Sequence, residues 1–314
     1  MAIKKYFLFI LLFIFSVLTA NAQWDSNISQ YWAMKNFYNP SFVGQSNALE
    51  SSMIHRRQWV GIKNAPVTSV VSVNMPLKLF GKEHGVGVLV NNDKLGLFSN
   101  TSFMVQYAYK FIFKGGKVLN VGLQGGMLNV DFDASGIIIP NSGGAFDASE
   151  IPSGGGDKVV DGGLGVAWVT PNYYLGASVS HLWNPSFSLD DNYDSYIART
   201  FYLVGGYNIK LGTPLLELQP SVFYKTDAIF HQVDLTARLN YKRFLNGGVS
   251  WRKDDGFIFL LGFKIRNIEA SYSYDLSTSE IGRVSKGTHE IFIKYSVPLS
   301  KAKKRGALKS IRIL

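Results

Sequence analysis

The side chains of this chain best suited to catalysis or metal binding are its five histidines, and their spacing matches no zinc motif. They are His55, His84, His181, His231 and His289. The pair His289-Glu290 begins like the zinc-binding helix of a metalloprotease, but Ile293 stands where that motif needs a second histidine. Cysteine is absent, so thiolate ligands are missing too. The sequence therefore predicts no metal and no other cofactor.

Motifs for an activated nucleophile are also missing. The chain contains no Gly-x-Ser-x-Gly elbow and no phosphate-binding glycine loop. Some membrane barrels hydrolyse lipids or peptides with Ser, His and Asp or Glu side chains that meet only in the folded protein, so a lipid-modifying enzyme stays open as an alternative. Without a site signal, we expect the protein not to be an enzyme.

The elements that would have to position any functional residue are strands. Segments that alternate at period two between turn signals number about fourteen, an even number within the range of single-chain outer-membrane barrels. No helical period competes with them after the N-terminal segment. The expected strands are residues 51 to 59, 66 to 75, 84 to 92, 101 to 111, 118 to 132, 160 to 169, 173 to 181, 198 to 208, 215 to 225, 230 to 241, 247 to 253, 256 to 265, 268 to 276 and 287 to 297.

Residues 100 to 113 illustrate the two faces of such a strand. One face carries Phe103, Val105, Tyr107, Tyr109 and Phe111, and the other carries Ser102, Gln106, Ala108 and Lys110. Period-two alternation indicates a sheet with one apolar face, which is either the core of a soluble sandwich or a lipid-facing wall.

One predicted hairpin and one polar strand favour the lipid-facing wall. A two-residue turn at Arg266-Asn267 pairs Phe263 with Ala270 on an apolar face and Lys264 with Glu269 on the opposite face. The strand over 230 to 241 alternates polar and apolar side chains in the same way. Its inward Asp234 and Arg238 need buried partners, which we expect among Glu217, Lys225 and their neighbours.

Loop lengths support the same fold. With a periplasmic N-terminus, the turns at 170 to 172, 242 to 246 and 266 to 267 fall at one end, and the loops at 133 to 159, 182 to 197 and 277 to 286 at the other. Short periplasmic turns and long external loops are typical of outer-membrane barrels. Charged residues are 17% and aromatic residues 14% of the chain, which contains 31 Gly. We expect an all-β protein, a single antiparallel transmembrane β-barrel in the outer membrane.

The chain ends predict export and a basic tail. Lys4 and Lys5 precede an apolar run from Tyr6 to Leu18, and Ala22 follows at a small-residue cleavage site, which is the pattern of a cleaved signal peptide. The formal net charge is +10, and six cations without an acid lie beyond the last strand. A nucleic-acid groove would instead spread cations over one face, so no nucleic-acid partner is expected. The tail cations are Lys301, Lys303, Lys304, Arg305, Lys309 and Arg312.

A set of short local motifs is more specific. They read Tyr38-Asn39-Pro40-Ser41-Phe42-Val43-Gly44, Arg57-Gln58-Trp59-Val60-Gly61, Ala65-Pro66-Val67-Thr68, Pro76-Leu77, Gly85-Val86-Gly87-Val88 with Asn92-Asp93, Ser273-Tyr274-Asp275-Leu276-Ser277 and Gly287-Thr288-His289-Glu290-Ile291. In this order and spacing they closely resemble the PorP/SprF family, outer-membrane proteins of the type IX secretion system of the Bacteroidota. The positions singled out as structural or partner-binding are Asn39, Pro40, Gly44, Arg57, Gln58, Trp59, Gly61, Pro66, Thr68, Tyr274, Asp275, His289 and Glu290.

The resemblance implies a barrel that supports secretion or surface anchoring of large proteins, such as gliding adhesins, whose C-terminal sorting domain is the export signal. Expected partners are this cargo, outer-membrane lipid, and periplasmic ring lipoproteins or a peptidoglycan-linked lipoprotein. A passive channel or lipophile transporter is the alternative, although inward groups such as Phe223, Phe292, Lys294 and Glu290 could fill the lumen. The expected parts are a signal peptide (1 to 22), a periplasmic lead-in (23 to 50), the barrel (51 to 298) and a basic periplasmic tail (299 to 314).

Overall fold

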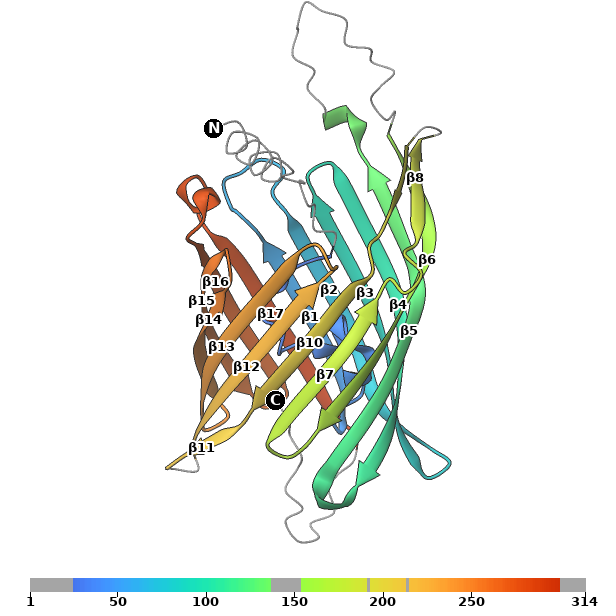
Figure 1. The fold of residues 1–314 in the computed structure, drawn as a ribbon. Coiled ribbons are helices and arrows are strands. Elements are labelled where there is room, and N and C mark those ends of the chain that lie inside the picture. The colour runs from blue at the N-terminus through green and yellow to red at the C-terminus, as the bar shows by residue number, and fades with distance from the viewer. Residues whose placement is uncertain (1–24, 137–153, 191–192, 213–214, 300–314) are drawn as a thin grey trace, which may run out of the picture.

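The computed structural model describes residues 25–136, 154–190, 193–212 and 215–299, and these form a closed 14-strand antiparallel barrel (Figure 1). Successive strands pair with each other, and the first pairs with the last through Ala48 and Pro298. The strands are β1 (Ala48–Arg57), β2 (Val67–Leu79), β3 (Lys82–Leu95), β4 (Phe98–Phe113), β5 (Lys117–Phe132), β6 (Gly155–Val169), β7 (Tyr173–Ser180), β10 (Thr200–Tyr207), β12 (Leu216–Thr226), β13 (His231–Tyr241), β14 (Leu245–Arg252), β15 (Gly256–Ile265), β16 (Ile268–Ser277) and β17 (Thr288–Pro298).

Each of these strands corresponds to one strand expected from the sequence. The hairpin β15–β16 has the predicted register, with Phe263 opposite Ala270 and Lys264 opposite Glu269. The predicted strand ends were less accurate. Strand β3 spans Lys82–Leu95 where residues 84 to 92 were expected, and β6 begins at Gly155 where residue 160 was expected. The reason is that pairing continues past the apolar part of the strand, where Asn92 lies opposite Thr101 and alternation no longer marks the strand.

The barrel presents apolar side chains outward and polar side chains inward. On β4, Phe103 is 50% exposed, whereas Gln106 is 1% exposed. A soluble sandwich would bury the apolar row instead, so the exposed aromatic and aliphatic belt is the lipid-facing surface of an outer-membrane barrel. Among the described residues, no helix is long and apolar enough to cross a bilayer.

The two ends of the barrel differ as expected. One end carries tight connections such as 170–172 and 266–267. The first residue of β1 and the last residue of β17 also lie at this end. The opposite end carries the longer connections, including the hairpin of β8 (Ser186–Asp190) and β9 (Tyr193–Tyr196) (Figure 1). Short turns face the periplasm in outer-membrane barrels. We therefore name these the periplasmic end and the extracellular end.

The remaining short elements lie in the connections. At the periplasmic end, β11 (Ile209–Leu211) extends the pairing of β12, and η2 (Lys114–Gly116) joins β4 to β5. At the extracellular end, η3 (Ala134–Gly136) follows β5 and η5 (Glu280–Arg283) follows β16.

Residues 25–47 lie inside the barrel and form what we call the plug (Figure 1). The plug contains α2 (Lys35–Tyr38) and η1 (Pro40–Phe42), and it runs from the extracellular end to β1 at the periplasmic end. This differs from the periplasmic lead-in expected over 23 to 50. Polar and aromatic residues at 25–47 show neither strand nor helix periodicity, so the sequence could not distinguish a lumen filling from a periplasmic extension. The expected signal peptide and residues 300–314 of the tail lie outside the described residues.

Candidate functional site in the barrel lumen

A buried charge cluster ties the plug to the strands that close the barrel. The backbone amides of Ser29 and Gln30 donate to the two carboxylate oxygens of Glu290 at 2.7 and 2.9 Å. Arg56 of β1 contacts Asp275 of β16 at 2.7 Å and Glu290 of β17 at 3.2 Å. The hydroxyl of Ser29 donates to Asp275 at 2.6 Å. Buried carboxylates need such partners. Here the plug supplies neutral hydrogen-bond donors, and Arg56 supplies positive charge.

The cluster continues to neighbouring strands through Arg252. Its guanidinium contacts Asp234 at 2.8 Å and lies 3.6 Å from Asp275. Asp234 therefore pairs with Arg252, which was not expected. It also accepts from the side-chain amide of Gln232 at 3.0 Å, and Gln232 is the register neighbour of Lys225, which was among the expected partners. Arg238 instead lies over the ring of Trp32 in the plug, with 4.6 Å between Cζ and the ring centroid.

Aromatic packing holds the middle of the plug. The ring of Tyr31 stacks on Phe223 of β12 at 5.0 Å between centroids, and Tyr38 lies 4.6 Å from the same ring. The Tyr31 hydroxyl lies 2.9 Å from the Ser221 hydroxyl and donates to Thr236 at 3.0 Å. The inward position of Phe223, expected from the sequence, is therefore used to pack the plug.

The motif residues Asn39 and Pro40 form the turn that brings the plug against the wall. The Asn39 side-chain amide donates to the carbonyls of Val166 and Ala177 at 3.2 Å each. Its oxygen accepts from the amide of Ser41 at 2.9 Å.

This contact is possible because the wall has no side chains there. A Cβ at Gly165 would lie 2.0 Å from Asn39 Oδ1, and one at Gly122 would lie 2.3 Å from the Ser41 nitrogen. Gly44, with φ of +61°, then turns the chain toward β1.

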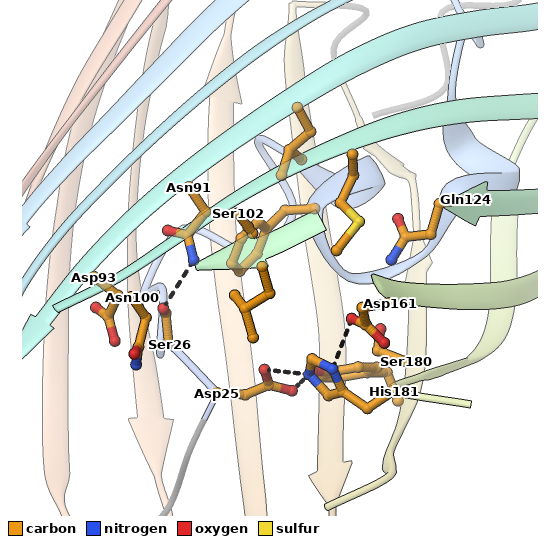
Figure 2. Close-up of a pocket in the computed structure, with 15 residues that line it drawn as sticks. Asp25, Ser26, Asn91, Asp93, Asn100, Ser102, Gln124, Asp161, Ser180 and His181 are labelled. Carbon is orange, nitrogen blue, oxygen red and sulfur yellow. Dashed lines mark hydrogen bonds and ion pairs between the residues drawn. The ribbon is translucent and has the colours of Figure 1, made fainter. Parts of the chain in front are cut away.

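A second ionic cluster holds the extracellular end of the plug. Asp25 contacts His181 at 3.0 Å, and His181 contacts Asp161 of β6 at 2.7 Å (Figure 2). Tyr202 donates to Asp25, and the Lys225 ammonium donates to the Asp25 carbonyl at 3.0 Å. Burial opposes the charge on His181, but Asp25 and Asp161 raise the pKa of its imidazole to about 10. His181 therefore stays protonated at neutral pH.

Asp25, Asp161, His181 and Tyr202 line a small cavity of about 60 Å³ between the plug and the wall. Asn91, Asn100 and Gln124 face it from three strands (Figure 2). A space of this size holds a few water molecules and excludes a lipid or a peptide. Within the part of the chain that the structure describes, no group of three or more His, Asp or Glu side chains could hold a metal ion.

The structure brings only some of the singled-out residues to the lumen. Five of them contact or belong to the plug, namely Asn39, Pro40, Gly44, Asp275 and Glu290.

Thr68 faces the lumen as well, with 1% exposure, and it donates to Asp93 at 2.5 Å. The others lie near the extracellular rim or on the outer wall. The backbone amide of Gln58 donates to the Pro66 carbonyl at 2.9 Å. Trp59 and Gly61 have φ of 45° and 102°, and they form the turn after β1. Tyr274 and His289 meet edge to face at 5.3 Å.

Arg57 is exposed on the outer face, whereas Arg56 reaches the lumen with 1% exposure. Arg56 was not singled out from the sequence, and a structural or partner-binding role of Arg57 stays a prediction. The signal was present, because Ser52, Ile54 and Arg56 share the inward parity of β1. Ser29, Asp25 and His181 had no comparable signal, since their partners are distant in sequence.

Comparison with known proteins gives one family and several structural likenesses. A family model for the type IX secretion system membrane protein PorP/SprF matches residues 20–295. No curated protein matches the chain. The P. putida toluene transporter TodX is similar at TM-score 0.49 and 10% identity, over 83% of this chain and 92% of that one. The Ralstonia pickettii transporter TbuX gives 0.47 and 11% over 85% and 93%, and Acinetobacter baumannii Omp33 gives 0.45 and 9% over 80% and 100%.

Proposed function

The chain belongs to the PorP/SprF family of type IX secretion system membrane proteins, and from that premise we propose a specific role. It is a non-enzymatic outer-membrane component that supports secretion or cell-surface anchoring of large proteins bearing a C-terminal sorting domain. The observation that carries the proposal is the plug. Plug residues fill the lumen from Asp25 to the start of β1, and the backbone amides of Ser29 and Gln30 bind Glu290. A filled lumen suits a scaffold better than a channel.

The surfaces left for binding are then the extracellular loops, the outer wall and the periplasmic turns. The β8–β9 hairpin is a two-stranded sheet of its own at the extracellular end. An unpaired strand edge can accept a strand of another protein. The edge of this hairpin therefore supports binding of cargo through a β-strand of the cargo. The periplasmic turns, with the basic tail after Leu299, would contact ring lipoproteins or a peptidoglycan-linked lipoprotein.

The first test is deletion of the gene followed by comparison of the secreted and surface proteins. Loss of proteins with a C-terminal sorting domain from the medium or cell surface is expected, with recovery on complementation. An unchanged profile would contradict the proposal. Complementation by a chain truncated after Leu299 tests the tail separately, and full recovery would leave the tail without a role.

The partners are tested by crosslinking and pull-down of the tagged protein from solubilised outer membrane. Recovery of a large exported protein or of periplasmic lipoproteins is expected, and a tagged unrelated barrel is the control. Planar bilayers test the alternative of a passive channel. Stable ion conductance by the wild-type protein would favour a channel, because the plug then could not be closing the lumen.

Catalysis is tested at His231 and His289. Both lie on the outer wall, where they contact Tyr224 and Tyr272 at 2.8 and 2.6 Å. Alanine at these positions, and at His181, should leave the lipid composition of the membrane unaltered. A change in lipid composition with the barrel still folded would instead favour the lipid-modifying enzyme.

A further inference from the structure

A row of paired residues at the extracellular end of the barrel carries cations. Arg57 is the last residue of β1 and lies directly opposite His289, the second residue of β17. On its other side Arg57 pairs with Val67 of β2, and Val67 pairs with Lys94 near the end of β3. Because neighbouring strands lie about 4.8 Å apart, the backbones of Arg57 and Lys94 are roughly 10 Å apart, within reach of one headgroup for such long side chains.

The side chains of this row point away from the lumen. Arg57 and Lys94 are exposed, and His289 is half-buried. Successive side chains of a strand point to opposite faces. The residues next to these three in sequence are buried in the lumen with at most 6% exposure, namely Arg56, Asp93 and Glu290. The cations therefore lie on the outer wall.

The depth of the row is that of the lipid headgroups in the extracellular leaflet. Toward the periplasm, the same strands continue with exposed apolar side chains, namely Met53 on β1, Val71 on β2 and Ile291 on β17. Tyr272 and Tyr274 pack beside His289, with ring centroids 6.1 and 5.3 Å from that of the imidazole. Tyrosines at the edge of an apolar belt mark the interface between hydrocarbon and headgroups.

No carboxylate of the described residues neutralises this row. Within the described ranges, Arg57 and Lys94 form neither an ion pair nor a side-chain hydrogen bond. The first carboxylate reached along the row is Asp131 of β5, two strands beyond Lys94 and opposite Ser99 of β4. Asp131 also accepts from Asn129. The positive charge is therefore available to an anion from outside the protein.

Two further donors lie beside Arg57. The backbone amide of Lys286 donates to the Val60 carbonyl at 2.7 Å, so the exposed Lys286 lies on the rim just above the row. The Tyr272 hydroxyl lies 2.6 Å from Nδ1 of His289. When this hydroxyl donates, the imidazole carries its proton on Nε2, which is then a donor.

We propose that Arg57, Lys94, Lys286 and His289 bind the phosphate of a glycolipid of the lipid A type in the extracellular leaflet. The guanidinium of arginine fits two phosphate oxygens, and the lysines add charge. The acyl chains would lie along the apolar side chains below the row. The position at the extracellular end selects a lipid of that leaflet. The site goes beyond the proposed secretion role and does not depend on it.

Native mass spectrometry of the protein refolded into lipid-free detergent micelles tests the site, with lipid A and dephosphorylated lipid A as the two probes. Wild-type protein should bind lipid A at least about tenfold more tightly than the dephosphorylated form. Each cation near a lipid phosphate contributes about fivefold in affinity. Arg57→Gln should therefore weaken lipid A binding by about fivefold, and Arg57→Gln with Lys94→Gln by about twentyfold.

Lys253→Gln is the matched control for Lys94→Gln. Lys253 is 52% exposed beyond the extracellular end of β14, and it already has Asp254 at 3.8 Å. This variant should bind lipid A like the wild type. Binding of both probes with equal affinity by the wild type, or unchanged lipid A binding by the double variant, would overturn the site. Equally tight binding of phosphatidylglycerol would overturn the assignment to a glycolipid of the extracellular leaflet.

Discussion

Replacing Arg56 with methionine should destabilise the barrel far more than replacing Arg57. Arg56 is 1% exposed and is held between Asp275 and Glu290, at 2.7 and 3.2 Å. Removing one partner of a buried ion pair costs about 3 to 5 kcal/mol, because a buried charge is left uncompensated. Arg252 remains 3.6 Å from Asp275, and Glu290 keeps the two amides of the plug, so the lower part of that range is expected.

The assay is equilibrium unfolding in urea of protein refolded into detergent micelles, followed by fluorescence of the six tryptophans. With a slope of about 2 kcal/mol per M, a loss of about 3 kcal/mol moves the midpoint down by about 1.5 M. Arg57→Met, at an exposed position of the outer face, should change the free energy of unfolding by no more than about 0.5 kcal/mol.

A double variant separates the lost ion pair from lost packing. Adding Glu290→Gln to Arg56→Met removes the carboxylate that Arg56 neutralised, so about 1 kcal/mol or more should be recovered relative to the sum of the single changes. A cost below about 1 kcal/mol for Arg56→Met, or purely additive effects, would refute the reasoning. Equal losses from Arg56→Met and Arg57→Met would show that the lumen network is not what stabilises the barrel.

Two further predictions concern the plug. Gly122→Val should displace residues 40 and 41 and raise ion conductance in planar bilayers, because its Cβ would lie 2.3 Å from the Ser41 nitrogen. Gly125→Val on the same strand meets nothing within 4 Å and should stay silent; equal conductance from both would contradict the contact. The pKa of Lys35 falls from 10.5 to about 7 on folding, so the unfolded chain binds more protons between these values and the free energy of unfolding should rise with pH there. Lys35→Met should flatten this rise in urea midpoints measured at pH 7 and 9, and a slope equal to that of the wild type would show that Lys35 is not the group responsible.

Period-two alternation predicted the barrel well because each strand has one lipid face and one lumen face. On β4 the row from Phe103 to Phe111 is partly or fully exposed, whereas Ser102, Gln106 and Ala108 are buried. The register of β15–β16 followed from the two-residue turn at 266–267. Strand ends were less predictable, since pairing extends beyond the bilayer where both faces meet water.

The lumen contacts were not predictable from the sequence. Asp275 and Glu290 were singled out, but their partners Ser29 and Arg56 lie more than 200 residues away in the chain. Local pattern carries no information about contacts at that separation. In the sequence, Gly122 and Gly165 do not differ from ordinary strand glycines. Only the folded structure shows that a side chain at either position would collide with the plug.

The charge cluster also links the two ends of the chain in the order of synthesis. Ser29 and Gln30 are made early, and Glu290 lies on the last strand, which pairs with β1 to close the ring. A barrel that closed with the plug outside would enclose Glu290 and Asp275 without the donors of Ser29 and Gln30. Closure of the barrel is therefore most favourable when the plug is already in the lumen. Pairing of the last strand with β1 thus depends on the correct placement of the N-terminal segment during assembly.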